Sequence, residues 1–238
     1  MVSHNGVEVL ERIPVDLDVG TVLKRLRLRS ENKHIEEVVR ELVETVLPVA
    51  KPKALCKIAY VDNKKADSLE IDGIRFTSRV LRINLDKVER VFPYVATCGR
   101  EVETIQVPAS DVLKGFCLDV MKTMILGSAV ACLQDYLTRS YALGQLSHMN
   151  PGSLESWPIT QQKELFSILG NVEDLIGVKL TERHTMVPVK SVSGICFPTG
   201  IKFESCQLCP REKCIGRRAA FNPELARKYQ EQASELSR

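Results

Sequence analysis

The pattern of apolar and polar positions predicts a chain that mixes helices with short strands. Apolar residues recur at helical spacing over 35–46, a helix that Ser30 would cap and Pro48 would end. Residues 54–97 read as strands, and Asp72-Gly73 between two apolar runs predicts a hairpin. We expect much of a sheet from this part of the chain.

The second half of the chain opens with its longest helical pattern. Pro108 and Ser110 start this stretch, which runs to Leu143 and should form the central helix. The elements expected after it are a loop at 150–153, a helix at 158–169, a short helix capped by Asn171, one or two strands at 187–198 broken at Gly194, and a helix from Pro223. Together these elements predict a single α+β domain with an antiparallel sheet.

Composition and charge narrow the class of protein. Of the 238 residues, 44% are hydrophobic and 26% charged, as in an ordinary globular protein. The net charge of +3 is too small to argue for nucleic acid or for an anionic membrane. The first residues do not resemble a signal peptide, and we see no apolar run of about 18 residues. We therefore expect a cytoplasmic protein with no membrane and no nucleic-acid partner.

Three of the eight cysteines stand close together, and we expect them to bind metal. Cys206, Cys209 and Cys214 have the spacing C-x2-C-x4-C, and thiolates ligate both zinc and iron–sulfur clusters. No histidine and no second C-x2-C pair lie nearby, so the usual zinc-ribbon spacing is missing. The surrounding cations are Arg211, Lys213, Arg217 and Arg218. These features favour an iron–sulfur cluster, of the [4Fe–4S] type, over structural zinc or a redox thiol set, and both alternatives stay open.

Three cysteines leave the fourth ligand of such a cluster undecided. Cys98, in the turn before Gly99, is our first candidate, and Cys196 is the second. An iron open to a small ligand is the alternative. The remaining cysteines lie in apolar patterns and are expected to be buried core thiols: Cys56, Cys117 and Cys132.

The stretch before the cysteines carries a second motif. Residues 177–194 contain Leu-Thr-Glu, Val-Pro and Ser-Val-Ser-Gly, and the loop His148-Met-Asn-Pro-Gly-Ser153 followed by Trp157-Pro158 precedes them. This combination resembles the C-terminal activation domain of cobalamin-dependent methionine synthase. The match covers about residues 110–205, with the N-terminal half similar in outline. The cysteine segment looks like an addition, as in free-standing relatives found beside corrinoid methyl-transfer systems.

The resemblance implies a fold, a ligand and a partner. The fold would be α+β, with a twisted antiparallel sheet and packed helices over 1–205, and with 206–238 as an added cysteine-ligand segment and C-terminal helix. The family's domain binds S-adenosylmethionine and presents it to a corrinoid that another domain holds. One electron and the methyl group convert inactive Co(II) to methyl-cobalt, and irreversible methyl transfer traps the small Co(I) population.

The resemblance also implies where S-adenosylmethionine would bind. The candidate residues are His148, Asn150, Pro151, Gly152, Ser153, Glu182 and Phe203. The family has an arginine in place of His148 and a tyrosine in place of Ser153. An arginine would grip the ligand's carboxylate by a bidentate fork, whereas a histidine makes a weaker and pH-dependent contact.

Our leading hypothesis is reductive activation of a corrinoid-binding methyltransferase protein. The iron–sulfur cluster would deliver the electron, and S-adenosylmethionine would supply the methyl group. One alternative is a non-enzymatic electron-transfer or scaffold subunit of a corrinoid methyltransferase complex, which the changes at His148 and Ser153 suggest. The other alternative is a structural zinc protein, so whether the chain is an enzyme stays open.

Overall fold

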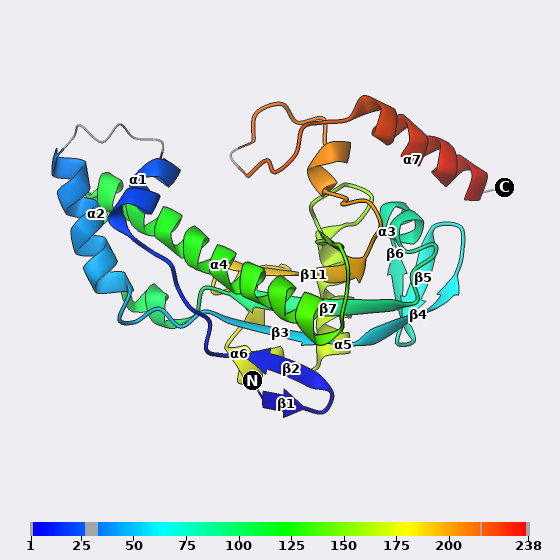
Figure 1. Cartoon of the computed structure of the whole chain (residues 1–238), viewed down its shortest axis with the longest axis horizontal. Coiled ribbons are helices and arrows are strands. Elements are labelled where there is room, and N and C mark those ends of the chain that lie inside the picture. Colours follow the sequence, from blue (N-terminus) through cyan, green and yellow to red (C-terminus); the bar gives the residue numbers. More distant parts are fainter. Residues whose placement is uncertain (1, 27–32, 215, 237–238) are drawn as a thin grey trace.

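An antiparallel sheet forms the centre of the structure (Figure 1), a computed structural model that describes residues 2–26, 33–214 and 216–236. The strands are β1 Val2–His4, β2 Val7–Leu10, β3 Lys53–Lys57, β4 Ala59–Lys64, β5 Ser68–Ile71, β6 Ile74–Thr77, β7 Arg90–Thr97, β8 Leu146–Met149 and β11 Ser191–Pro198. β7 pairs with β3, β4 and β11, and β11 continues the sheet to β8. Every pairing among these strands is antiparallel, which confirms the predicted α+β class.

Helices cover both faces of the sheet. They are α1 Val19–Leu26, α2 Lys33–Val46, α3 Arg79–Asn84, α4 Val112–Ser140, α5 Gln162–Leu169, α6 Val172–Ile176 and α7 Pro223–Leu236. Side chains alternate between the faces of a strand, so Tyr94 of β7 packs with the C-terminal half of α4, and Val95 packs with α5 and α6. Because both faces are covered, the residues of β7 from Val91 to Thr97 are all buried.

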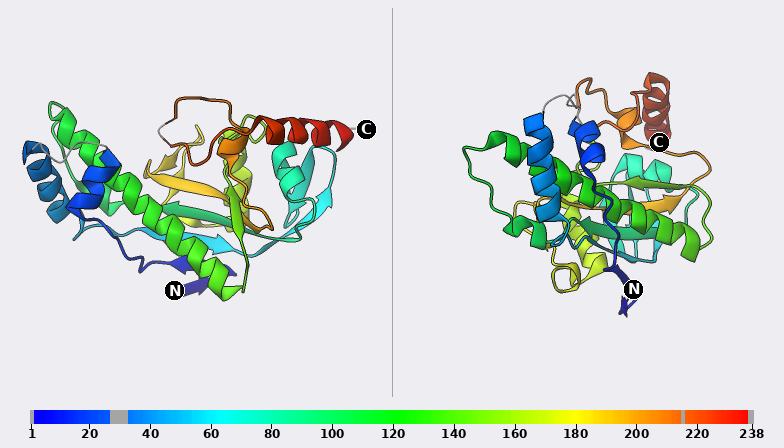
Figure 2. Two further views of the ribbon diagram at one scale, coloured as in Figure 1. Left: turned by 45° about the horizontal axis from the view of Figure 1, so that its top comes forward. Right: turned by 60° about the vertical axis from the view of Figure 1, so that its left-hand side comes forward.

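Helices α1 and α2 and the N-terminal half of α4 lie beside the sheet (Figure 2), and their apolar side chains form a separate cluster. Leu23, Leu42 and Met121 represent the three helices in this cluster. Helix α2 confirms the helix expected before Pro48, while its expected cap at Ser30 lies outside the described residues.

Helix α4 is the long central helix that the sequence predicts. It is capped by Asp111, whose side chain accepts a hydrogen bond from the Lys114 amide at 3.0 Å, so the helix begins just after the predicted start at Pro108 and Ser110. By length, and by a mean hydropathy of 1.7 over an 18-residue window, the helix could cross a membrane, so our expectation of no such apolar stretch is wrong. Core helices pass the same test, and the buried side of α4 packs on the sheet and on α1 and α2.

Two local expectations are wrong and one is confirmed. Helix α3, capped by the Ser78 side chain, interrupts the region that we expected to be all strand. Strand β11 runs without a break through Gly194, which lies opposite Tyr94. The hairpin between β5 and β6 is present, and its two turn residues, Asp72 and Gly73, have the positive φ angles that such a turn needs.

The C-terminal segment packs on the rest of the molecule. A short 3₁₀ helix, Ser205–Leu208, follows β11, and α7 contacts both it and α3. The ring of Tyr229 in α7 stacks on Phe203 with centroids 5.7 Å apart, and its hydroxyl donates to Asn84 at 3.0 Å. These contacts hold the helix expected from Pro223 against the sheet domain.

Candidate ligand loop and cysteine segment

The loop at 150–153 is a tight turn that follows the edge strand β8. The Gly152 amide donates to the carbonyl of Trp157 at 2.7 Å, and the Ser153 amide donates to that of Asn150 at 3.2 Å. Gly152 has a φ of +80°, and a Cβ there would lie 2.7 Å from a methyl carbon of Ile159. Only glycine fits this position without strain, which explains Gly152.

The side chain of Asn150 fastens this loop to the sheet. Its Nδ2 donates to the hydroxyl of Tyr94 at 2.8 Å and to the carbonyl of Ser193 at 2.7 Å. The closeness depends on Gly194, where a Cβ would lie 2.5 Å from Nδ2 of Asn150. Asn150 therefore has a positioning role, and its buried side chain points into the protein.

His148 lies in β8 with both ring nitrogens engaged. The guanidinium of Arg218 is 2.6 Å from Nε2, and the Gln134 side-chain amide is 3.0 Å from Nδ1. Burial, reinforced by the charge of Arg218, lowers the pKa of His148 to about 4, so the ring is neutral at pH 7. Since arginine can only donate, Nε2 accepts and the neutral ring carries its proton on Nδ1. The Gln134 atom that faces Nδ1 is Nε2, so Nδ1–H donates to this side chain once the amide is turned to present its oxygen.

Cys206 and Cys209 lie on one turn, which Arg217 holds together. The guanidinium of Arg217 donates to the carbonyls of Cys206 at 3.3 Å, Cys209 at 3.2 Å and Ala219 at 3.1 Å, and also to that of Arg211. Cys209 donates its amide to the Cys206 carbonyl, which closes the turn at 3.3 Å. Cys214 is exposed further along the same loop.

The sulfur of Cys206 lies in a positive environment. Partial burial acts to raise its pKa, but backbone N–H groups of Arg218 and Ala219 and the charges of Arg218 and Arg217 outweigh burial and lower that pKa. The Arg218 amide is 3.4 Å from Sγ. Such N–H···S contacts and cations favour the thiolate, the form that binds metals.

The structure does not bring Cys98 to this segment. Cys98 follows the end of β7 that pairs with Ser191, whereas the cysteine segment follows the opposite end of β11, about 23 Å away along an eight-residue strand. Cys98 is buried with the helices α1, α2 and α4. Within the described residues, no group of three or more metal-binding side chains is already assembled.

Of the other candidates, two are buried near β8 and one is exposed away from the loop. Cys196, our second choice, lies opposite His148 in the sheet but is buried, and burial raises its pKa to about 12. Phe203 is buried next to β8, where its amide donates to the Ser147 hydroxyl at 2.7 Å. Glu182 is exposed in the turn between β9 (Lys179–Leu180) and β10 (Met186–Val187), which precedes the far end of β11. It is not brought together with the loop.

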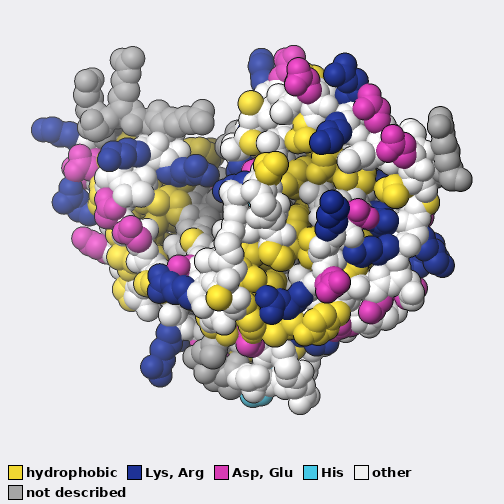
Figure 3. Space-filling model, turned by 45° about the vertical axis from the view of Figure 1, so that its right-hand side comes forward, with side chains coloured by type: hydrophobic (Ala, Val, Ile, Leu, Met, Phe, Trp, Pro, Cys, Tyr) yellow, Lys and Arg dark blue, Asp and Glu magenta, His cyan; other side chains and the backbone are white. Residues whose placement is uncertain are grey.

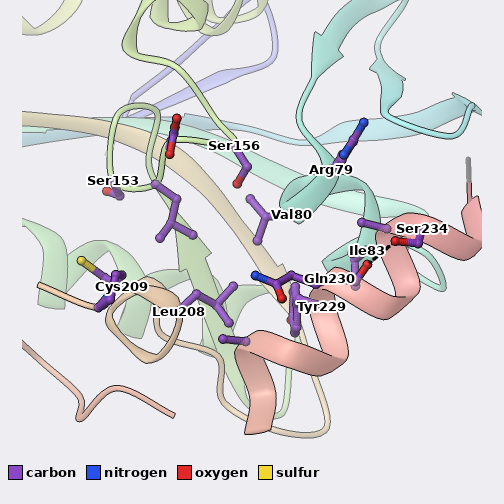
Figure 4. Close-up of a pocket in the computed structure, with 15 residues that line it drawn as sticks. Arg79, Val80, Ile83, Ser153, Ser156, Leu208, Cys209, Tyr229, Gln230 and Ser234 are labelled. Carbon is purple, nitrogen blue, oxygen red and sulfur yellow. Dashed lines mark hydrogen bonds between the residues drawn. The ribbon is translucent and has the colours of Figure 1, made fainter. Parts of the chain in front are cut away.

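A cavity joins the loop to the cysteine segment. It has a volume of about 720 Å³ and lies between α3, the loop after Gly152, the segment 208–210 and α7 (Figure 4). Ser153 and Cys209 both line it, while Leu208 and Tyr229 contribute apolar surface. Figure 3 shows the side of the molecule that carries α7 and β4–β6, where hydrophobic and charged side chains are interspersed.

Sequence reasoning missed the residues that connect these parts. Gln134, Glu204 and Arg218 were not among the site candidates, although Arg217 and Arg218 were noted as cations near the cysteines. The arginine pair was a usable signal for charge compensation. Its contact with a histidine 70 positions away depends on the fold alone.

Comparison with known proteins defines the class of fold. No family model matches the chain, and no curated protein matches it in sequence. Among solved structures, this fold of an antiparallel sheet with helices on its faces is similar to that of a reactivation domain. The matching structure is described as "Crystal Structure of the MetH Reactivation Domain bound to AdoHcy", with a TM-score of 0.55 and 13% identity over 98% of this chain and 88% of that one. The predicted resemblance to the activation domain is confirmed at the level of the fold.

Proposed function

We propose that this protein reactivates a corrinoid-binding methyltransferase protein, with S-adenosylmethionine as methyl donor and a metal cluster at the cysteines as electron source. The main support is that the loop after β8 and the cysteine segment line one cavity, through Ser153 and Cys209, in a fold similar to a reactivation domain that was solved with AdoHcy. A cytoplasmic location and a partner that is neither nucleic acid nor membrane stay predictions.

The residues of the cysteine segment fit an iron–sulfur cluster by their chemistry. Cys206 and Cys209 share one turn, Cys214 lies on the same loop, and the sulfur of Cys206 faces N–H groups and arginines. The three sulfurs are not preassembled in the described structure, which is common where metal binding and loop ordering are coupled. When bound, the cluster would supply a low-potential electron that an external reductant replenishes.

The chain's own residues would hold the methyl donor. The Asn150 side chain fixes the loop that leads to Ser153, and Ser153 lines the cavity.

The proposed reaction takes place at the cobalt of the partner protein. One electron converts Co(II) to Co(I), and Co(I) then takes the methyl group from the sulfonium of S-adenosylmethionine. The products are methyl-Co(III) and S-adenosylhomocysteine, so charge and atoms balance.

The test follows the spectrum of the cobalt. Anaerobic protein, a low-potential reductant and a Co(II) corrinoid protein are mixed with and without S-adenosylmethionine. We expect loss of the Co(II) band and formation of methyl-cobalt only with S-adenosylmethionine. No change under either condition would exclude the proposal.

A pair of cysteine variants tests the metal. Cys209→Ser should abolish a broad absorption band near 400 nm in anaerobically purified protein, whereas Cys117→Ser, in the buried α4 cluster, should keep it. Full iron content in Cys209→Ser would show that the ligand assignment is wrong. Stoichiometric zinc without iron or sulfide would instead support the structural zinc protein.

A second candidate function is an electron-transfer or scaffold subunit that does not use S-adenosylmethionine. The observation that favours it is that both ring nitrogens of His148 are engaged by Gln134 and Arg218, and so do not face a ligand. Calorimetry separates the two functions, because tight binding of S-adenosylmethionine would argue against the scaffold.

A further inference from the structure

Arg218 touches both parts of the candidate site. Its backbone amide is 3.4 Å from the sulfur of Cys206, and its guanidinium is 2.6 Å from Nε2 of His148. His148 belongs to β8, directly before the loop at 150–153. One residue of the cysteine segment therefore reaches the strand that positions the ligand loop.

The side chain of Arg218 is held by two groups on the sheet domain. The buried, neutral ring of His148 offers a lone pair at Nε2, and arginine donates to it. The second group is Glu204, with its Oε2 3.5 Å from Nε of Arg218. Among the described residues this buried oxygen has no hydrogen-bond partner, so its interaction with Arg218 is ionic. A displaced guanidinium would leave Nε2 of His148 without its donor, while Glu204 would keep Lys202, whose Nζ is 3.6 Å from Oε1.

The backbone of Arg218 follows the cysteine turn. Arg217 binds the carbonyls of Cys206, Cys209 and Ala219, which ties this stretch of backbone to the turn that carries the thiolates. The amide of Arg218 also contacts the sulfur of Cys206, so a rearrangement that gathers the sulfurs around a metal acts on the position of Arg218. The guanidinium then either keeps or loses its place at His148.

We infer that Arg218 couples occupancy of the cysteine segment by metal to binding at the loop after β8. The inference rests on the proposed function, and it names the regulation of that site. In the structure the guanidinium already lies at His148 and Glu204, and metal ligation would restrict the turn that leads to Arg218 and so stabilise this contact before the methyl donor arrives. The donor then meets a preorganised loop and binds more tightly. By linkage, the donor strengthens metal binding by the same factor.

Calorimetry on paired samples tests the coupling. S-adenosylmethionine is titrated into the anaerobic protein with its iron–sulfur cluster reconstituted and into the metal-free protein. The wild type should bind about 5-fold or more tightly when loaded. Arg218→Ala should bind equally in both states. Arg211→Ala removes the same charge from the same loop but leaves the backbone carbonyl that Arg217 uses, so it should behave as the wild type.

The possible failures are distinguishable. Equal binding by both states of the wild type, or a preserved difference in Arg218→Ala, would overturn the coupling and leave the proposed function standing. If the loaded and metal-free forms of Arg211→Ala also bind S-adenosylmethionine equally, the effect depends only on net charge. That result would overturn the coupling as well. If neither state binds S-adenosylmethionine, the proposed function and the coupling both fall.

A second readout needs no methyl donor. The ring nitrogens of His148 are followed by ¹⁵N NMR while zinc, a diamagnetic probe, is added to the metal-free protein, and His148→Gln identifies the signal among those of the four histidines. The His148 signals should shift in the wild type and in Arg211→Ala, and stay unchanged in Arg218→Ala. An unchanged wild-type signal, or a lack of zinc uptake by the cysteines, would overturn the inference.

Discussion

The buried ring of His148 makes the stability of the protein depend on pH between about 4 and 6.5. Its pKa is lowered from 6.5 to about 4 by burial and by the charge of Arg218. Lys202 acts in the same direction and Glu204 opposes it. Between pH 6.5 and pH 4 the histidine is protonated in the unfolded chain but neutral in the folded one. Its contribution to the free energy of unfolding is therefore fully present above pH 6.5 and is lost as the pH falls towards 4.

The magnitude follows from the two pKa values. At pH 5 the histidine is almost fully protonated in the unfolded chain and mostly neutral in the folded one. The free energy of unfolding is therefore about 2 kcal/mol lower at pH 5 than at neutral pH. In His148→Gln, the amide can still accept from Arg218 but does not titrate. The variant should therefore lose about 2 kcal/mol less than the wild type between pH 7 and pH 5.

Denaturant unfolding at the two pH values measures this difference. Carboxylates whose pKa is lowered, such as Asp18 and Asp86, also destabilise the protein in acid, but they do so equally in both proteins and cancel. His4→Gln, at an exposed position in β1, is the matched control and should behave as the wild type. Equal losses in wild type and His148→Gln would refute the reasoning.

Three further predictions concern the stability of single variants. Gly194→Ala should destabilise the protein by about 2 to 4 kcal/mol in denaturant unfolding, because a Cβ there would displace the side chain of Asn150; an unchanged stability would contradict this placement. Gly127→Ala, on an exposed turn of α4 with open space around it, should instead stabilise by about 0.5 to 1 kcal/mol in the same assay. Tyr229→Phe should cost about 1 kcal/mol through loss of the bond to Asn84, and should reduce hydrogen-exchange protection of α7; full protection would show that this bond does not hold the helix.

The sequence by itself determined the local elements, because their signals lie within a few neighbouring residues. Helical spacing marked α2 and α4, the Asp72-Gly73 pair marked a hairpin, and Asn171 caps α6 as expected. The spacing of Cys206 and Cys209 likewise reflects one turn, which the structure shows closed by a backbone hydrogen bond.

The tertiary structure decided what depends on distant partners. A glycine usually weakens a strand, but at Gly194 it admits the side chain of Asn150, so β11 continues through it. Cys98 lies near a turn in sequence, yet the antiparallel register places it at the opposite end of β11 from the cysteine segment. The contact of Arg218 with His148 arises because β8 and the segment after β11 meet at the same end of the sheet. No local sequence pattern indicates this contact, since only the folded chain brings the two residues together.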